Sequence, residues 1–213
     1  MSFGWTTFDV TNRLPEGWRH HVREAGKRAG FREFPCTPIL SREASQVTTI
    51  SRGRVDADQV REGLPWLYES YRGYFLQLAQ EARAEPVVPA RDDRYGVVLN
   101  VQQGTSMRFE CHVDSNPLTG LLFCTDHQPG SGELVFAHDR AAASVAEVDK
   151  DCSVIQPHAG HLIFFDGRQY PHYARPLTDE ADVRIVAVMN FYTESCPEST
   201  RPAVLNRHRF GVE

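Results

Sequence analysis

The chain lacks the marks of several large protein classes: paired-cysteine motifs, long apolar runs and an excess of basic charge. Its five cysteines are an odd number and none forms a Cys-x-x-Cys pair, so we expect neither a disulfide framework nor a zinc knuckle. The longest purely apolar runs, such as 162–165 and 185–189, are only long enough for strands, which argues against a membrane span. A formal net charge of −5 argues against a nucleic-acid binder.

The first residues also lack the cationic start and the apolar stretch of an export signal. Together with the unpaired cysteines, this favours a cytoplasmic location. A chain of 213 residues with 41% hydrophobic residues can bury one sizeable core, so we expect a single domain over 1–213. Within it we expect an N-terminal helical layer over about 1–90, a β core over about 95–192 and a C-terminal tail over 193–213.

Helical signals are confined to the N-terminal part of the chain. Residues 15–29 are rich in helix formers, and Gly30 is a typical helix end. A β-branched run at 46–51 predicts a strand. Pro65 then suits a helix start, and an apolar stripe at spacings of three and four runs on to Ala82, before Pro86. We expect this stripe to pack against a sheet and 85–93 to be a connector.

From residue 95 onward the period becomes that of strands. Short runs rich in Val, Ile, Phe and Tyr alternate with turns rich in Gly, Pro, Asp and Asn. The runs lie at 96–101, 107–112, 118–125, 133–136, 153–155, 161–165, 170–174 and 183–192. Many short strands without intervening helices indicate an antiparallel sandwich or barrel.

Histidine is concentrated in this part, because six of the nine histidines fall between 112 and 172. His112 and Asp114 stand two residues apart, so at a strand end both side chains would project to one side. Such a pair is weak evidence alone, since about 0.5 are expected by chance. With His172 as a third member, two histidines and one carboxylate match the facial triad that binds non-haem Fe(II).

Arg184 opens an apolar strand twelve residues after His172. A buried guanidinium needs a partner, and its planar shape suits a carboxylate. An ordinary ion pair at a strand end would explain the same residue.

Several segments together resemble the Fe(II)/2-oxoglutarate-dependent dioxygenases of the prolyl-4-hydroxylase-like branch. They are 108–114, 132–136, 157–167 and the pair His172 and Arg184. The resemblance implies a mainly β fold with N-terminal helices, a double-stranded β-helix of the jelly-roll, cupin-like kind. It further implies that His112, Asp114 and His172 bind the iron and that Arg184 holds the distal carboxylate of 2-oxoglutarate. Gln102 stands where family members often carry a tyrosine that contacts this cosubstrate, and we expect it to keep that contact.

The family resemblance also implies a reaction. Fe(II), 2-oxoglutarate and O₂ would oxidise an unactivated C–H bond, with release of succinate and CO₂. Halogenases of this kind replace the carboxylate of the triad by a small residue, so Asp114 favours hydroxylation or a related desaturation or cyclisation. The acidic chain carries no separate peptide- or nucleic-acid-binding module, so we expect a small-molecule substrate, such as an amino acid or a natural-product intermediate. The sequence indicates no oligomeric state.

Three alternatives remain open from the sequence. The substrate could be a protein or peptide side chain, the protein could be a cupin-type metalloenzyme that does not use 2-oxoglutarate, or it could be a non-catalytic jelly-roll binding protein. The remaining histidines of the cluster are predicted to be structural or at the surface: His127, His138, His158 and His161. His138 with Asp139 could instead line a substrate pocket.

Overall fold

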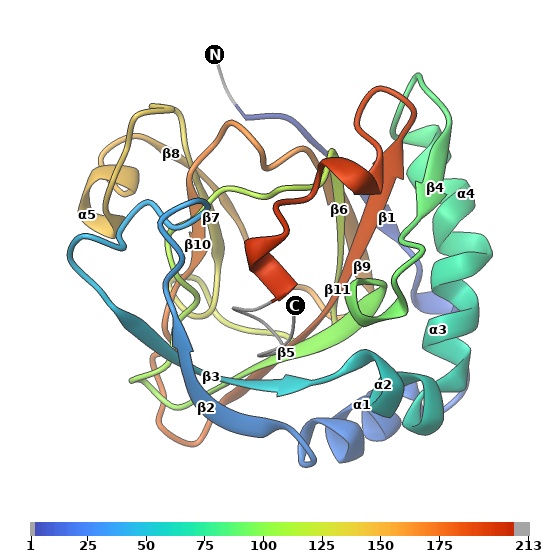
Figure 1. Cartoon of the computed structure of the whole chain (residues 1–213). Helices are drawn as coiled ribbons and strands as arrows, with labels where there is room; N and C mark the ends of the chain where they lie inside the picture. The colour runs from blue at the N-terminus through green and yellow to red at the C-terminus, as the bar shows by residue number, and fades with distance from the viewer. Residues whose placement is uncertain (1–2, 207–213) are drawn as a thin grey trace.

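The computed structural model describes residues 3–206, in which two antiparallel sheets face each other and helices cover the outer side of the larger one (Figure 1). The larger sheet has the order β1-β9-β6-β11-β5-β3-β2, and β4 also pairs with β11. Its strands are β1 (Trp5–Asp9), β2 (Gly30–Pro35), β3 (Thr49–Val55), β4 (Val87–Pro89), β5 (Val97–Gln103), β6 (Leu118–Phe123), β9 (His161–Phe165) and β11 (Val183–Thr193). The smaller sheet has the order β10-β7-β8, with β7 (Leu134–Ala137), β8 (Cys152–Ile155) and β10 (His172–Ala174).

Short helices complete the structure. The outer layer consists of α1 (Trp18–Gly26), α2 (Ala57–Gly63), α3 (Pro65–Arg72) and α4 (Tyr74–Glu81). One-turn elements are η1 (Thr11–Arg13), η2 (Asp93–Tyr95), α5 (Val145–Val148) and η3 (Glu198–Thr200). Within residues 3–206, no helix combines the length and the apolar character needed to cross a bilayer.

Alternation along the long strands divides their side chains between two cores. On β11, Ile185 and Ala187 face the helices, where they join the cluster that contains Tyr71 and Phe75. The intervening Val186 faces the smaller sheet and packs with residues such as Phe136. Arg184 precedes Val186 by two residues, so the same alternation turns it into the space between the two sheets.

Tyr71 of α3 joins the helical layer to the large sheet by hydrogen bonds as well as by packing. Its side chain is fully buried, and its hydroxyl donates to the carbonyl of Asn190 and accepts from the amide of Ala90, each at 2.7 Å. Both partners are backbone groups near the protein interior. The hydroxyl therefore satisfies a donor and an acceptor that water does not reach.

We expect Tyr71→Phe to lower the free energy of unfolding by about 1–3 kcal/mol, because both backbone groups lose their partner without a gain of volume. Chemical denaturation measures this difference. Tyr74→Phe is the matched control, since no hydrogen bond of the Tyr74 hydroxyl is present among residues 3–206. Equal stability of the two variants would contradict the prediction.

The predicted fold, mainly β with N-terminal helices and a double-stranded β-helix, is confirmed. The strand predicted at 161–165 coincides with β9, and those at 118–125 and 183–192 match β6 and β11 to within two residues. The helix predicted from Pro65 is interrupted at Gly73, whose φ of −117° and ψ of −100° lie outside the helical region. The strand predicted at 46–51 begins three residues later, as β3.

Two parts of the prediction are wrong. Residues 107–112 form no strand; His112 makes only isolated bridges, and the Glu43 carboxylate binds the backbone amide of Cys111 at 2.8 Å and pairs with Arg108 at 2.7 Å. The Glu43 side chain thus supplies hydrogen bonds that pairing with a neighbouring strand would otherwise give. The N-terminal region and the expected connector also contain the strands β1, β2 and β4. Five of the six residues of β2 are exposed, so its sequence lacks the alternation that marks a half-buried strand.

Candidate metal centre

His112, Asp114 and His172 come together between the sheets. His112 and Asp114 lie in the segment before β6, whereas His172 opens β10. The backbones of the two histidines pair directly: each amide donates to the other carbonyl at 2.9 Å. Asp114 Oδ1 lies 3.6 Å from His112 Nε2 and 3.7 Å from His172 Nε2, and one ligand atom from each residue lies within 4.8 Å of the others. Within residues 3–206 this is the one such group of His, Cys, Asp or Glu side chains.

Both imidazoles are oriented by backbone carbonyls. His112 Nδ1 donates to the carbonyl of Glu110 at 2.8 Å, and His172 Nδ1 donates to that of Tyr170 at 2.9 Å. A carbonyl only accepts, so these contacts place the proton of each neutral ring on Nδ1. The unprotonated Nε2 atoms therefore point towards Asp114, which is the arrangement of metal-binding histidines.

Burial and mutual charge set the protonation states. Burial and the neighbouring His112 lower the pKa of His172 to about 4, so that this ring is neutral at neutral pH. Burial alone would raise the pKa of Asp114, but its interactions with His172 and His112 and a hydrogen bond from Thr119 hold this pKa well below its usual value. A neutral imidazole and an ionised carboxylate are the forms that bind a metal.

Aromatic rings and one glycine fix the position of these side chains. Phe136 stacks on the His172 ring at a centroid distance of 4.8 Å, and Phe165 meets it edge-on at 5.6 Å. Gly167 lies close to both His172 and Asp114. A Cβ at residue 167 would lie 2.7 Å from His172 Cε1 and would overlap Asp114 Oδ2. Since its φ is not positive, it is the close approach, rather than backbone strain, that requires a glycine.

Thr119 of β6 holds the second oxygen of Asp114. Its hydroxyl donates to Asp114 Oδ2 at 2.7 Å and accepts from Asn116 Nδ2 at 2.9 Å. Thr119 is only 3% exposed, so water does not replace these bonds. The chain from Asn116 to Thr119 to Asp114 fixes the carboxylate with Oδ1 directed at the histidines.

Thr119→Val should weaken Fe(II) binding by about 10- to 100-fold, because the carboxylate loses the contact that orients it while the volume of the side chain is kept. Anaerobic titration against a competing chelator measures this affinity. Thr7→Val, on the exposed face of β1, is the control and should bind as the unmodified protein does. An affinity within twofold of the control would remove Thr119 from the site.

Arg184 is buried at the other end of the same space. Its side chain is 2% exposed; Nε donates to the carbonyl of Gly132 at 2.6 Å, and Nη1 donates to Gln102 Oε1 at 2.9 Å. Gly132 has a φ of +64°, and a Cβ there would lie 2.8 Å from Arg184 Cδ, so only glycine allows this approach. Burial lowers the pKa of Arg184 to about 10, which leaves it charged at neutral pH.

No carboxylate within residues 3–206 lies within ion-pair distance of Arg184, so an ordinary ion pair in this part of the chain does not explain it. A buried guanidinium without an anion is costly. Arg184 also lines a cavity, here called the inner cavity, together with His112, Asp114 and His172. The remaining wall of the inner cavity is largely apolar, with Leu121, Leu134, Phe165, Val186 and Val188.

Gln102 lies behind Arg184 and is not among the residues that line the inner cavity. Its Oε1 accepts from Arg184, while its Nε2 donates to the carbonyls of Arg175 at 3.1 Å and Met107 at 3.3 Å. Asn100, two residues earlier on β5, lines the inner cavity instead. This placement favours a role for Gln102 in orienting Arg184 over the direct contact expected from the sequence.

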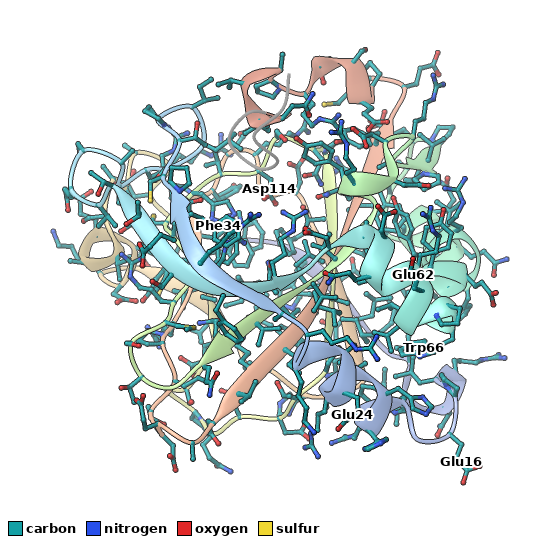
Figure 2. The ribbon with its side chains drawn as sticks, turned by 60° about the horizontal axis from the view of Figure 1, so that its bottom comes forward. Glu16, Glu24, Phe34, Glu62, Trp66 and Asp114 are labelled. Carbon is teal, nitrogen blue, oxygen red and sulfur yellow. The ribbon has the colours of Figure 1, made fainter. Side chains whose placement is uncertain are left out.

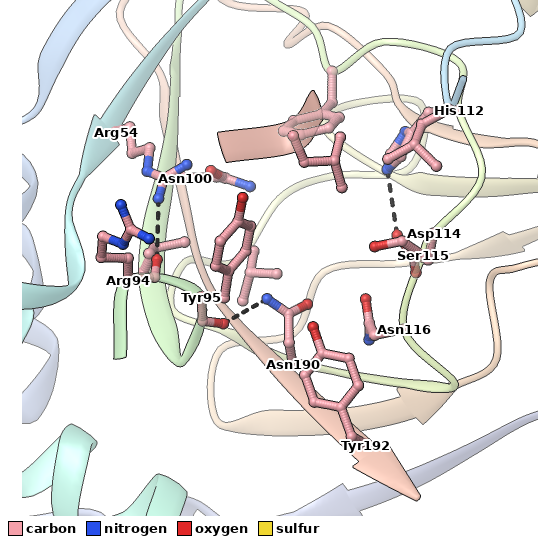
Figure 3. Close-up of a pocket in the computed structure, with 15 residues that line it drawn as sticks. Arg54, Arg94, Tyr95, Asn100, His112, Asp114, Ser115, Asn116, Asn190 and Tyr192 are labelled. Atoms are coloured by element: carbon pink, nitrogen blue, oxygen red, sulfur yellow. Dashed lines mark hydrogen bonds and ion pairs between the residues drawn. The ribbon is translucent and has the colours of Figure 1, made fainter. Parts of the chain in front are cut away.

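A second, outer cavity adjoins the first (Figure 3). The two share the wall residues Asn100, Phe109, His112, Asp114 and Val188. In Figure 2, Asp114 lies inside the barrel, whereas Glu24 and Glu62 project from the outer helices. His112 and Asp114 thus stand where the two cavities meet, whereas His172 lines the inner cavity alone.

The other histidines of the cluster line neither cavity. His138 Nδ1 lies 2.7 Å from Asp151 Oδ1 and its Nε2 lies 2.9 Å from Ser153 Oγ. His127 Nε2 lies 3.0 Å from Thr125 Oγ1, and the rings of His158 and His161 lie 5.3 Å apart. The alternative in which His138 lines a substrate pocket is therefore not supported.

Sequence reasoning missed Thr119, Asn100 and the polar wall of the outer cavity. One signal was present: on β5 and β11, every second residue is apolar and faces the helices, while polar residues such as Asn100 and Asn190 interrupt the opposite face. A polar residue on the inward face of a buried strand is a candidate for a site.

No family model matches the chain, and no curated protein matches it. Solved structures do match. SnoN, a non-haem alpha-ketoglutarate-dependent epimerase from nogalamycin biosynthesis, is 13% identical with a TM-score of 0.64, and the match covers 99% of this chain and 87% of SnoN.

Two Streptomyces proteins match in the same way. AviO1 from Streptomyces viridochromogenes is 17% identical over 92% of each chain, with a TM-score of 0.62. HygX from Streptomyces hygroscopicus, solved with nickel and 2-oxoglutarate bound, is 12% identical with a TM-score of 0.59, over 91% of this chain and 84% of HygX. The chain has the fold of the 2-oxoglutarate-dependent oxygenases. Other matches include a carbocyclase, SnoK, and a prolyl-4-hydroxylase from Pseudomonas putida.

Proposed function

We propose that the protein is an Fe(II)- and 2-oxoglutarate-dependent dioxygenase that oxidises an unactivated C–H bond of a small molecule. One observation carries the proposal: a His-Asp-His group and a buried arginine without a carboxylate partner in residues 3–206 line the same cavity. The His-Asp-His group offers three ligands to a metal, and the arginine offers a positive charge to an organic anion. A diacid could reach from the metal to the arginine and bind both.

The donor set fits iron. His112, Asp114 and His172 would hold Fe(II), since two imidazoles and one carboxylate are the ligands of non-haem iron oxygenases. When bound, iron would supply the O₂ chemistry that converts 2-oxoglutarate to succinate and CO₂. The chain itself contributes placement: Thr119 and the Glu110 and Tyr170 carbonyls keep the three ligands oriented.

Arg184 would bind the distal carboxylate of 2-oxoglutarate. Its contacts with Gly132 and Gln102 hold the guanidinium in one orientation, and the apolar wall formed by residues such as Leu134 and Val186 suits the methylene groups of the diacid. The same wall excludes water and so strengthens the pairing of charges. The outer cavity, on the other side of His112 and Asp114, would receive the substrate.

The proposed substrate is a small molecule, such as an amino acid or a natural-product intermediate. Structural neighbours support this class: SnoN has been solved with nogalamycin RO, and HygX with hygromycin B. Hydroxylation is the simplest outcome of C–H oxidation, and Asp114 as a third ligand supports it. The neighbours also include an epimerase and a carbocyclase, so product analysis must decide the outcome.

The decisive experiment is anaerobic titration of the protein with Fe(II) and then with 2-oxoglutarate. We expect the weak visible charge-transfer band of a metal–keto-acid complex. Arg184→Ala should weaken 2-oxoglutarate binding by about 10- to 100-fold, as expected for loss of a charge-assisted hydrogen-bonded pair, and leave Fe(II) binding unchanged. Arg28→Ala, at an exposed position after α1, is the matched control.

Each alternative gives a different result. Iron binding without the band would favour a cupin-type enzyme that does not use 2-oxoglutarate, and absence of iron binding would favour a non-catalytic jelly-roll protein. A band together with oxidation of a protein or peptide, but of no small molecule, would favour a side-chain hydroxylase. Unchanged 2-oxoglutarate affinity in Arg184→Ala would remove Arg184 from the site.

A further inference from the structure

The outer cavity is where a substrate would lie if the inner cavity holds 2-oxoglutarate, because the two cavities meet at His112 and Asp114. Most of the side chains that line the outer cavity are polar or aromatic. Three of them are asparagines: Asn100, Asn116 and Asn190. A side-chain amide has two donor hydrogens and one acceptor oxygen, so its partners inside the protein show which end is left for a ligand.

The two arginines in the same wall are already paired with carboxylates. Arg54 Nε lies 2.7 Å from Asp56 Oδ1, and Arg94 Nη2 lies 2.8 Å from Asp92 Oδ2. Because these carboxylates compensate both charges, the arginines do not make the cavity selective for an anion.

Asn190 of β11 has its amide nitrogen engaged by the protein. Nδ2 donates to the Tyr95 carbonyl at 2.6 Å, and since a carbonyl only accepts, this contact fixes the orientation of the amide. Asn190 Oδ1 accepts no hydrogen bond from any of residues 3–206. Asn100 is the opposite case, because its Oδ1 accepts from Arg52 Nη1 at 3.2 Å.

Asn116 is fixed by two contacts of its nitrogen. Nδ2 donates to the Leu118 carbonyl at 2.7 Å and to Thr119 Oγ1 at 2.9 Å. The hydroxyl hydrogen of Thr119 is given to Asp114, so Thr119 can only accept from Asn116, and the amide has one possible orientation. Asn116 is 5% exposed, and its Oδ1 accepts from no donor within residues 3–206.

The side chains of Asn116 and Asn190 are directed into the same cavity, as Figure 3 shows. An acceptor oxygen in a buried wall is costly unless water or a ligand brings a hydrogen to it. Amide oxygens accept from hydroxyl or amino groups. The wall therefore fits a ligand that brings hydrogen-bond donors better than one that brings acceptors alone.

We propose that the substrate is a small molecule whose hydroxyl or amino group donates to the side-chain oxygens of Asn116 and Asn190. This assignment rests on the function proposed above, since it takes the outer cavity as the site of the substrate. Asn116 has a second role: the amide that accepts from the substrate also donates to Thr119, which orients Asp114. Hydrogen bonds in such a chain strengthen one another, so the donor group is held in a fixed position relative to a proposed iron ligand.

The test uses the full chain, loaded anaerobically with Fe(II) and 2-oxoglutarate, and a panel of small polyols, amino alcohols and amino acids. Each compound is compared with the analogue that lacks one hydroxyl or amino group. Each alcohol is also compared with its fluoro analogue, which is similar in size but cannot donate a hydrogen bond. The readout is the change of the visible band on addition of each compound, which does not require turnover.

We expect at least one compound to act at a concentration at least about tenfold lower than that needed for its analogues without the donor, because those analogues leave the amide oxygens unpaired. Alcohols and amines in separate parts of the panel show which of the two donor groups is recognised.

Asn190→Leu and Asn116→Leu remove the two oxygens with little change of volume. Each should reduce the preference for the donor-bearing compound by at least about threefold, and the double variant should abolish it. Only Asn116→Leu should also weaken Fe(II) binding, because only Asn116 is joined through Thr119 to Asp114. Asn12→Leu, at an exposed position in η1, is the matched control. Formation of the visible band by each variant checks that it is folded.

Three results would overturn the proposal: equal response to every compound and its analogues, a preference that survives in the double variant, or no response to any compound in protein that forms the band. Equal Fe(II) affinity of Asn116→Leu and Asn12→Leu would contradict the second role of Asn116. The comparison of analogues in the unmodified protein decides the matter even if Asn116→Leu does not fold. Failure to form the band at all would instead refute the proposed function.

Discussion

His172→Ala should abolish both the visible band with 2-oxoglutarate and the formation of succinate. Loss of a direct ligand should weaken Fe(II) binding more than loss of a residue that only orients a ligand, which typically costs a factor of about 10 to 100. The position of His172 explains why no neighbour can replace it: within residues 3–206 no other His, Cys, Asp or Glu completes the group with His112 and Asp114. Anaerobic Fe(II) titration and succinate assays measure the two losses.

The control for this prediction is His158→Ala, an exposed histidine that lines neither cavity. It should leave both the band and succinate formation unchanged. Because Phe136 and Phe165 pack on the His172 ring, the alanine variant should also be less stable, and a circular dichroism spectrum must show that it is folded. Succinate formation at the unmodified rate in folded His172→Ala would refute the proposed metal site.

Gly167→Ala should weaken Fe(II) binding at least as much as loss of Thr119 does, although residue 167 carries no ligand atom. The added Cβ would overlap Asp114 Oδ2 and lie 2.7 Å from His172 Cε1. Neither side chain can move away freely, since Thr119 holds the carboxylate and Phe136 stacks on the imidazole. The strain therefore falls on the relative placement of two ligands, and we expect at least about 10-fold weaker binding.

Gly4→Ala is the matched control, because a Cβ at Gly4 meets nothing within 4 Å and its φ is not positive. It should bind Fe(II) as the unmodified protein does. Thermal unfolding without metal distinguishes two causes of weaker Fe(II) binding in Gly167→Ala: local displacement of the ligands and general disruption of the fold. A large loss of stability would indicate general disruption. Unchanged Fe(II) affinity in Gly167→Ala would show that the two ligands have room to shift.

Much of the β core could be predicted from the sequence because its strands are buried on at least one face. Runs such as 161–165 and 183–192 are largely apolar, and turn residues bound them. The polar edge strands β1 and β2 escaped prediction because they bury little, so their residues carry no clear period. The segment 107–112 was misjudged because the Glu43 side chain, distant in sequence, replaces a ladder.

The residues of the site were likewise predicted only in part. The pattern of His112, Asp114, His172 and Arg184 predicted a metal group and an arginine for an anion, and the structure brings all four to one cavity. Gln102 was placed by its distance from His112 along the chain, but its side chain packs behind Arg184. Thr119 and Gly167 had no signal of their own, because what distinguishes them is the atom that each one contacts.

The sequence by itself determined the residue types and the alternation that sends them to one side of a strand or the other. The tertiary structure decided which of those sides face each other: pairing of β10 with the segment at His112 brings residues 60 positions apart within contact, and pairing of β3 with β5 brings Arg54 beside Asn100. Local periodicity can specify a face, since it depends on backbone geometry alone. Distances between faces depend on sheet order and packing, which no single segment contains.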